Sequence, residues 1–285
     1  MGTDGSAPRT SFPAPLATAL VALGWFAMLA AGPFLLQGLG LRIALLLSEL
    51  VLVLPALLVL LLLRMPLSRA LSLRRLGAAA AALSLLAGAA FWGASLGLLE
   101  VQYALWRPPD GYLESFRRLH EALRPSGPLD AVVSVAAIAL APALCEEALF
   151  RGLVLPAFLR SFGGAVAVAA SAALFGLIHL DLASLALGVA RASLAAISAS
   201  TYRVPFAFAV GIGLGTLRLR SGSLLPPFLA HALLNTITFV AAPYTDDPAG
   251  GLPDARPLLG LAFMAGGLVV AVLAMRRIDS PFRDP

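Results

Sequence analysis

The chain has 285 residues, of which 60% are hydrophobic and 12% charged, and its formal net charge is +5. Soluble domains carry about twice that charged fraction, so the composition excludes an ordinary water-soluble protein. No basic patch interleaved with aromatic residues is present, which argues against a nucleic-acid partner. The single cysteine, Cys145, excludes an intramolecular disulfide, and the use of arginine alone as the cation is typical of a GC-rich bacterial genome.

Apolar runs of about twenty residues, the length that crosses roughly 30 Å of hydrocarbon, recur along the chain. We therefore expect an all-α fold, a polytopic transmembrane helix bundle of about eight spans. The first run is too long for the core of a signal peptide and is interpreted as a retained anchor. The expected spans are 13–39, 43–63, 78–98, 131–158, 164–188, 204–219, 223–243 and 257–275. The apolar stretch 184–203 carries Arg191 and Arg203, which leaves the extent of the sixth span open.

The polar segments divide the chain into five parts around one membrane domain. They are a disordered cytoplasmic tail (1–12), N-terminal transmembrane helices (13–99), a polar insert with the amphipathic stretch "YLESFRRLHEALR" (100–130), a core (131–243), and a last helix with a cytoplasmic tail (244–285).

The arginines predict the orientation, because arginine collects in the cytoplasmic loops of membrane proteins. With eight spans, nine arginines fall on the side that holds both termini, whereas the other side receives seven acidic residues and four arginines that neighbouring carboxylates offset. We therefore expect an integral protein of the bacterial inner membrane with both termini in the cytoplasm. The nine are Arg64, Arg69, Arg74, Arg75, Arg160, Arg218, Arg220, Arg276 and Arg277.

Few ionisable groups lie at membrane depth, where each costs several kcal/mol unless it is paired or hydrated. Glu147 and Arg151 are four residues apart, so they can form a structural ion pair along one helix face. Glu146 is rotated by about 100° from that face, and it needs a partner from another helix. His179 and His231 are the candidates.

The segment "HALLN" adds a second polar pair, since His231 and Asn235 are one helical turn apart and can face one cavity. Glu146, His179 and Asn235 also fall near the middle of their apolar runs. Pro142, four residues before Glu146, removes a backbone hydrogen bond and favours a bend there. We therefore expect Glu146, His179, His231 and Asn235 to line one cavity.

Three ordered motifs resemble a known family. "EEALFR" at 146–151, "FGLIH" at 175–179 and "HALLN" at 231–235 match the EExxxR, FxxxH and HxxxN motifs of the CAAX-protease and bacteriocin-processing (CPBP) intramembrane endopeptidases. The resemblance covers about 131–243 and implies a type II CAAX prenyl endopeptidase-like enzyme. About twenty extra residues follow His179, which departs from the commonest spacing of the family.

The resemblance also implies roles for these residues. Glu146 and His179 would activate a water, and His231 and Asn235 would stabilise the oxyanion. A carboxylate in an apolar cavity suits a general base, and fixed donors suit an oxyanion site. The substrate would be a membrane-associated peptide or protein; eukaryotic members of the family act on prenylated proteins at the cytosolic membrane face.

The need for a metal is open at this stage. Glu146, His179 and His231 would form a ligand set for a divalent ion such as zinc, with water in the fourth position. The sequence has no HExxH motif, and a glutamate-activated water needs no metal. No cofactor is therefore required, and metal assistance stays an alternative.

Three polar or reactive residues have simpler interpretations. Glu49 is expected to be an interhelical hydrogen-bond partner or to lie near a hydrated crevice, with no link to the motifs. Cys145 is expected to be a packing residue, and His120 a solvated surface residue.

Two other classes of function remain as alternatives. A proton-coupled transporter would also place carboxylates and histidines at mid-depth, and a non-catalytic scaffold or bacteriocin-immunity protein could retain the motifs without cutting. For a protease, the sequence predicts a cavity that opens towards the arginine-rich, cytoplasmic half, with the acidic insert covering the opposite face.

Overall fold

The computed structural model describes residues 12–107, 112–241 and 256–278, and all regular structure within them is helical. The all-α fold expected from the sequence is confirmed. The predicted tail at 1–12 lies outside the described residues except for Phe12, as do residues 242–255 and 279–285. The helices are α1 (Ala14–Leu39), α2 (Leu41–Leu62), α3 (Leu67–Ala70), α4 (Ala78–Leu105), α5 (Tyr112–Ala122), α6 (Pro128–Val135), α7 (Ala141–Glu147), α8 (Leu155–Leu159), α9 (Gly164–Leu177), α10 (Leu182–Ala190), α11 (Leu194–Thr201), α12 (Val204–Ser221), α13 (Leu225–Ala241) and α14 (Pro257–Arg277).

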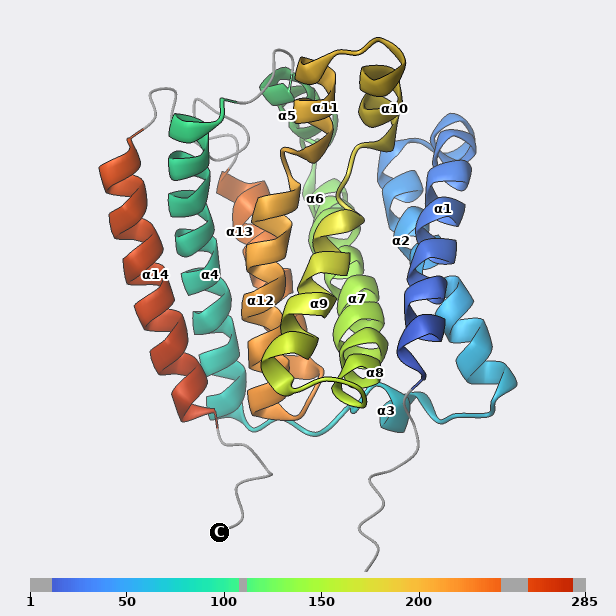
Figure 1. The fold of residues 1–285 in the computed structure, drawn as a ribbon, viewed down its shortest axis with the longest axis vertical. Coiled ribbons are helices and arrows are strands. Elements are labelled where there is room, and N and C mark those ends of the chain that lie inside the picture. The colour runs from blue at the N-terminus through green and yellow to red at the C-terminus, as the bar shows by residue number, and fades with distance from the viewer. Residues whose placement is uncertain (1–11, 108–111, 242–255, 279–285) are drawn as a thin grey trace, which may run out of the picture.

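The long helices lie side by side along one axis (Figure 1). α1 begins and α14 ends at the same end of the bundle, and α3 lies there too. The short helices α5, α10 and α11 lie at the opposite end. We call these the arginine end and the insert end. The nine arginines of the orientation argument lie in or shortly after α3, directly after α2 or α8, or in the last turn of α12 or α14.

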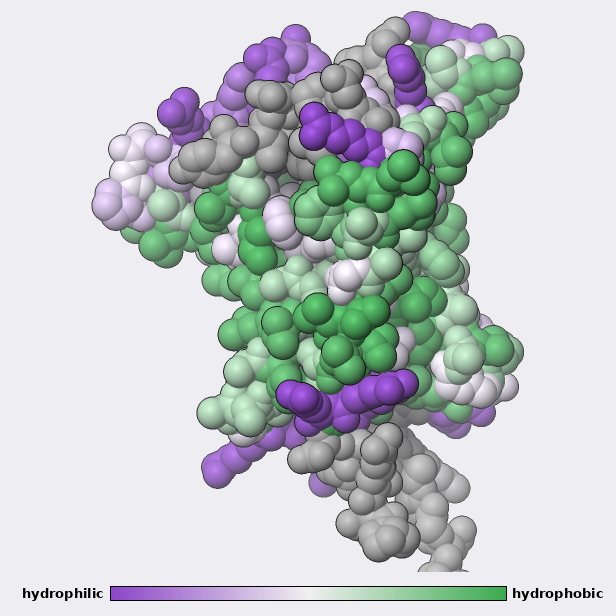
Figure 2. Space-filling view, turned by 90° about the vertical axis from the view of Figure 1, so that its left-hand side faces the viewer, coloured by the Kyte–Doolittle hydropathy of each residue, from purple (hydrophilic) through white to green (hydrophobic). Residues whose placement is uncertain are grey.

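A broad hydrophobic band separates two hydrophilic ends (Figure 2). Six helical stretches among the described residues are long and apolar enough to cross a membrane. Two of the expected spans correspond to shorter helices, Gly164–Leu177 and Leu225–Ala241. At about 1.5 Å per residue, the first extends only ~21 Å. The protein is a polytopic transmembrane bundle, and the number of complete crossings stays a prediction.

Two boundaries differ from those expected. The fifth span, predicted over 164–188, ends earlier because α9 stops at Leu177 and Asp181 caps a new helix by accepting a hydrogen bond from the backbone N–H of Ser184. The extra residues after His179 form the helical pair α10 and α11. The polar insert begins later than residue 100, because α4 continues to Leu105 and buries Glu100.

Residues 128–159 form one long helix in which two π-helical segments, η1 (Ala136–Leu140) and η2 (Ala148–Val154), flank α7. Each π segment comes shortly before a proline, Pro142 or Pro156. A proline offers no N–H and its ring clashes with the carbonyl four residues earlier. The wider π turn relieves that clash. The bend expected at Pro142 thus takes the form of a π-helical turn just before the two glutamates.

Candidate functional site

Both glutamates of α7 approach the imidazole of His231 on α13. The Nδ1 of His231 lies 2.9 Å from Oε1 of Glu147, and its Nε2 lies 3.7 Å from Oε2 of Glu146. A carboxylate only accepts hydrogen bonds, so Nδ1 carries the proton and donates. The side chains of Glu146 and Glu147 diverge by about 100° because they are consecutive on a helix. The imidazole of His231 still approaches both carboxylates, because its two nitrogens lie on different edges of the ring.

The ion pair expected between Glu147 and Arg151 is present and almost completely enclosed. Nη1 of Arg151 lies 2.8 Å from Oε1 of Glu147, and the two side chains are 1% and 0% exposed. Nη2 of Arg151 donates to the carbonyl of Gly211 at 3.1 Å. Since Glu147 also accepts from His231, the pair fixes a histidine of the candidate site as well as neutralising charge.

Phe175 packs between these groups. Its ring centroid lies 4.6 Å from Cζ of Arg151 and 6.0 Å from the ring of His231. A guanidinium over an aromatic face is attracted by the ring quadrupole. This first residue of the FxxxH motif therefore covers the Arg151–Glu147–His231 chain.

His179 lies just beyond the last residue of α9, in the turn that leads to α10. Its Nδ1 is 2.8 Å from the carbonyl oxygen of Phe175. A carbonyl only accepts, so this nitrogen donates, and the neutral ring keeps Nε2 as an acceptor. No hydrogen bond joins His179 directly to Glu146, although both side chains line the same cavities.

Two cavities meet at Glu146 and His179. The smaller, of about 330 Å³, is lined by all four predicted site residues: Glu146, His179, His231 and Asn235. The larger, of about 620 Å³, contains Glu146 and His179 but neither His231 nor Asn235. The structure thus brings together four side chains that are up to ninety positions apart in sequence.

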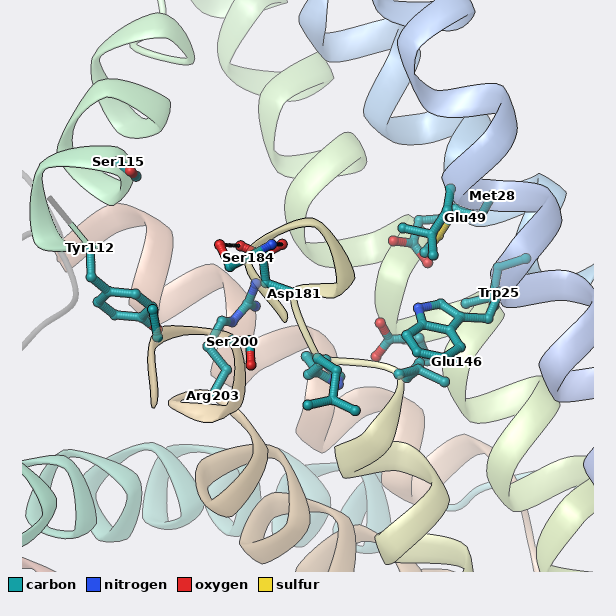
Figure 3. A pocket seen from close by; sticks show the side chains of 16 residues that line it. Trp25, Met28, Glu49, Tyr112, Ser115, Glu146, Asp181, Ser184, Ser200 and Arg203 are labelled. Atoms are coloured by element: carbon teal, nitrogen blue, oxygen red, sulfur yellow. Dashed lines mark hydrogen bonds between the residues drawn. The ribbon is translucent and has the colours of Figure 1, made fainter. Parts of the chain in front are cut away.

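The larger cavity extends towards the insert end. Figure 3 shows Glu146 deep in it, with Tyr112 and Ser115 of α5 and Asp181, Ser184 and Arg203 from the region of α10 to α12 further along. Asp181 and Arg203 are exposed to solvent. The prediction that the cavity opens towards the arginine end is therefore wrong.

Close packing of helices closes the arginine end of the bundle. Nε of Arg218 donates to the backbone carbonyl of Arg151 at 3.2 Å, and the N–H of Leu224 donates to the carbonyl of Ser72 at 3.3 Å. A Cβ on Gly152 would lie 2.6 Å from a methyl carbon of Leu71. These contacts join η2, α12 and the segment around α3 below the glutamates.

The predicted polar insert lies over the cavities. Tyr112 of α5 lines both of them, and His120 lines the smaller one. His120 is half-buried, and its ring stacks on Phe239 with centroids 6.2 Å apart, so it belongs to the wall of the smaller cavity as well as to the surface. Glu114, on the outer face, accepts hydrogen bonds from Arg118 and Arg117, which lower the pKa of its carboxyl.

The candidate metal ligands do not form a metal centre in this arrangement. No group of three or more His, Cys, Asp or Glu side chains among residues 12–107, 112–241 and 256–278 is placed to hold an ion. Nδ1 of His231 binds Glu147 and Nδ1 of His179 binds a carbonyl, which leaves Nε2 of each ring as the nitrogen available to the cavity. Metal assistance through Glu146, His179 and His231 therefore stays an alternative that the sequence predicted.

Sequence reasoning missed the part of the site that α1 and α2 contribute. Glu49 lines both cavities with Glu146. This agrees with its expected place near a crevice and adds a link to the motifs that the sequence did not show. Trp25 lines the larger cavity. A carboxylate in the run "LLLSELVLV" was the available signal, because an ionisable group at membrane depth marks a functional site by default. Cys145 is buried in the hydrophobic core, as expected.

An all-α membrane bundle with a glutamate, two histidines and an amide around one buried cavity defines a candidate intramembrane hydrolase. Residues 128–237 match the family model described as Rce1-like, type II CAAX prenyl endopeptidase Rce1-like. The resemblance inferred from the three motifs is confirmed, and this segment matches a family of proteases, which supports an intramembrane endopeptidase as the general activity. No curated protein and no solved structure matched the chain.

Proposed function

We propose that this protein is an intramembrane endopeptidase in which Glu146 and His179 activate a water, while His231 and Asn235 stabilise the oxyanion. The observation that carries the proposal is that these four side chains line one cavity of about 330 Å³. They do so within a segment that matches a protease family.

The first step follows from the acceptors that face the cavity. Glu146 takes one proton from the water as the water oxygen bonds to the carbonyl carbon of the scissile peptide. The same proton passes to the leaving nitrogen when the C–N bond breaks. His179 holds the water through Nε2, because its Nδ1 is committed to the carbonyl of Phe175.

The oxyanion site depends on the protonation of His231. Because Nδ1 donates to Glu147, the ring donates from Nε2 to an oxyanion only when both nitrogens carry protons. Glu147, held by Arg151 at 2.8 Å, is the counter-ion for that form. Asn235 supplies a neutral donor one turn along α13. No step uses a metal or another cofactor.

Purified protein in lipid nanodiscs, incubated with a mixed peptide library, tests this mechanism by mass spectrometry of the products. We expect Glu146→Gln to abolish cleavage and Asn235→Ala to lower kcat by about a hundredfold or more. Glu121→Gln, an exposed carboxylate of α5, and Thr236→Ala are the matched controls. Unchanged kcat in both site variants would contradict the mechanism.

We further propose that both termini face the cytoplasm of a bacterium, because arginine collects on the cytoplasmic side. The cavity reaches towards the insert end, so the substrate, a membrane-associated peptide or protein, approaches from the non-cytoplasmic side of the plasma membrane. This differs from the cytosolic access that the eukaryotic relatives suggest.

Thiol labelling tests the orientation. In a Cys145→Ala background, we place single cysteines at Ala122, which ends α5, and at Ser161, which follows α8; both positions are exposed. A membrane-impermeant reagent should label Ala122→Cys in intact cells and Ser161→Cys only after lysis. The reverse labelling pattern would mean the opposite orientation in the membrane, with the substrate approaching from the cytoplasm.

A further inference from the structure

Two residues that line the larger cavity each carry a buried polar atom without a hydrogen-bond partner in the described structure. The two atoms are Nε1 of Trp25 on α1 and Oε2 of Glu49 on α2. A buried donor or acceptor without a partner costs about 1–3 kcal/mol. Two such atoms, one donor and one acceptor, on residues that line one cavity therefore indicate a polar occupant.

Both residues line the cavity of about 620 Å³ that also contains Glu146. Figure 3 shows Trp25 and Glu49 on the same wall, beside the carboxylate of Glu146. A water takes up roughly 30 Å³ of liquid volume, so this space holds several waters. Glu146 itself has only the 3.7 Å approach to His231, which leaves its other lone pairs for such an occupant.

Close helix packing fixes this wall. A Cβ on Gly24 would lie 2.0 Å from the backbone oxygen of Leu52, so α1 and α2 approach each other as closely as only a glycine permits. Gly24 immediately precedes Trp25, and Leu52 is about one turn from Glu49. α2 in turn packs against α7, which carries Glu146.

We propose that Trp25 and Glu49 are positioning residues that hold the hydrolytic water against Glu146, the indole N–H donating to it and the Glu49 carboxylate accepting from it. The inference rests on the proposed endopeptidase function. Trp25 and Glu49 gain and lose no proton over the cycle; the proton leaves the water for Glu146 and then reaches the leaving nitrogen. Both residues lie outside the segment 128–237 that matches the protease family, so the N-terminal helices complete the site.

Besides Glu146 and Glu49, the charged or titratable residues that line the same cavity are Tyr112, His179, Asp181 and Arg203. Tyr112 begins α5, His179 lies on the side of α9, and Asp181 and Arg203 come directly before α10 and α12. They leave the wall formed by α1 and α2 to Trp25 and Glu49. Of the two protons of the water, one faces Glu146, the base, and the other is shared between the acceptors Glu49 and Nε2 of His179.

Steady-state kinetics of the nanodisc enzyme on one peptide cleaved by the wild type test the proposal. Trp25→Phe keeps the aromatic ring and removes the N–H, and Glu49→Leu keeps the approximate shape and removes the acceptor. Since a misplacement of about 1 Å costs roughly a hundredfold in rate, we expect kcat to fall about ten- to a hundredfold in each, with KM within about twofold. Glu49→Gln, which retains an acceptor oxygen, should restore part of the loss. Phe34→Leu, whose parent ring is 77% exposed on the same helix, is the matched control.

The outcomes separate the inference from the function on which it rests. A kcat within twofold of wild type in both Trp25→Phe and Glu49→Leu, with Glu146→Gln inactive, overturns the inference and leaves the endopeptidase intact. A large rise in KM at constant kcat also overturns it, because the residues would then bind substrate. Cleavage that persists in Glu146→Gln defeats the proposed mechanism itself. If Glu49→Leu does not fold, Trp25→Phe alone decides by the same kcat criterion.

Discussion

Removing one partner of the Glu147–Arg151 pair should destabilise the protein far more than removing the charge of Glu146. The two side chains are 0% and 1% exposed and lie 2.8 Å apart. In Glu147→Gln, the guanidinium of Arg151 keeps the carbonyl of Gly211 and the ring of Phe175 but loses its counter-charge. Breaking a buried pair in this way costs about 3–5 kcal/mol.

The same geometry predicts the stability of three further variants: Arg151→Leu, the double variant of Glu147 and Arg151, and Glu146→Gln. Arg151→Leu leaves Glu147 charged, with His231 as its remaining partner at 2.9 Å, and should cost a similar amount. The double variant removes both charges. Its loss of unfolding free energy should therefore be smaller than the sum of the two single losses by roughly 1–3 kcal/mol. Glu146→Gln should change stability by less than about 1 kcal/mol, because Glu146 has no cation within hydrogen-bond distance.

Equilibrium unfolding in mixed micelles, followed by tryptophan fluorescence, measures these free energies. A cycle in which the two single losses add, each below about 1 kcal/mol, would refute the reasoning that the pair neutralises two buried charges. Equal losses in Glu146→Gln and Glu147→Gln would remove the distinction between a working carboxylate and a structural one.

Two further predictions concern packing and pH. A Cβ on Gly97 would lie 2.2 Å from the carbonyl oxygen of Gly260, so Gly97→Ala should separate α4 from α14 and cost about 1–3 kcal/mol. Gly93→Ala, with nothing within 4 Å of its Cβ, is the control in the same unfolding assay; equal effects would contradict the close contact. The pKa of Glu114 lies below its ordinary value of 4.5 because Arg118 and a neighbouring arginine donate to it, so the stabilisation of α5 is present above pH 4.5 and is lost as the pH falls through the lowered value. The protection factors of the α5 amides against hydrogen exchange, which are corrected for the intrinsic pH dependence of exchange, should fall from pH 6 to pH 3 in the wild type and not in Glu114→Gln; identical pH dependence of the protection factors in both would contradict the assignment.

The parts of the site that depend on one helix were readable from the sequence. Glu147 and Arg151 are paired by the repeat of the helix itself, and His231 and Asn235 share a face for the same reason. The apolar runs also predicted the long helices, because hydrocarbon thickness sets their length. Local periodicity was sufficient for each of these features.

The features that depend on packing between helices could not be predicted from the sequence. Nothing in the spacing shows that His231 reaches both glutamates, since that requires the relative positions of α7 and α13. The end of α9 before His179 is set by the cap at Asp181, which an apolar average over 164–188 conceals. Glu49 joins the site only because α2 packs against α7.

The direction of the cavity was also beyond the sequence. The arginine count orients the chain, but it does not say which end of a bundle is sealed. That depends on contacts such as the hydrogen bond from Arg218 to the carbonyl of Arg151. The prediction failed because the distribution of arginines indicates which end faces the cytoplasm, but it does not determine at which end the cavity opens.

Quantitative proteomics of protein termini tests the central claim most directly. Cells that lack the chromosomal gene are supplied with wild type, Glu146→Gln or Glu121→Gln at equal abundance in the membrane. We expect new termini in membrane-associated proteins with wild type and with Glu121→Gln, and their absence with Glu146→Gln. The same set of termini in all three strains would contradict a protease that works through Glu146.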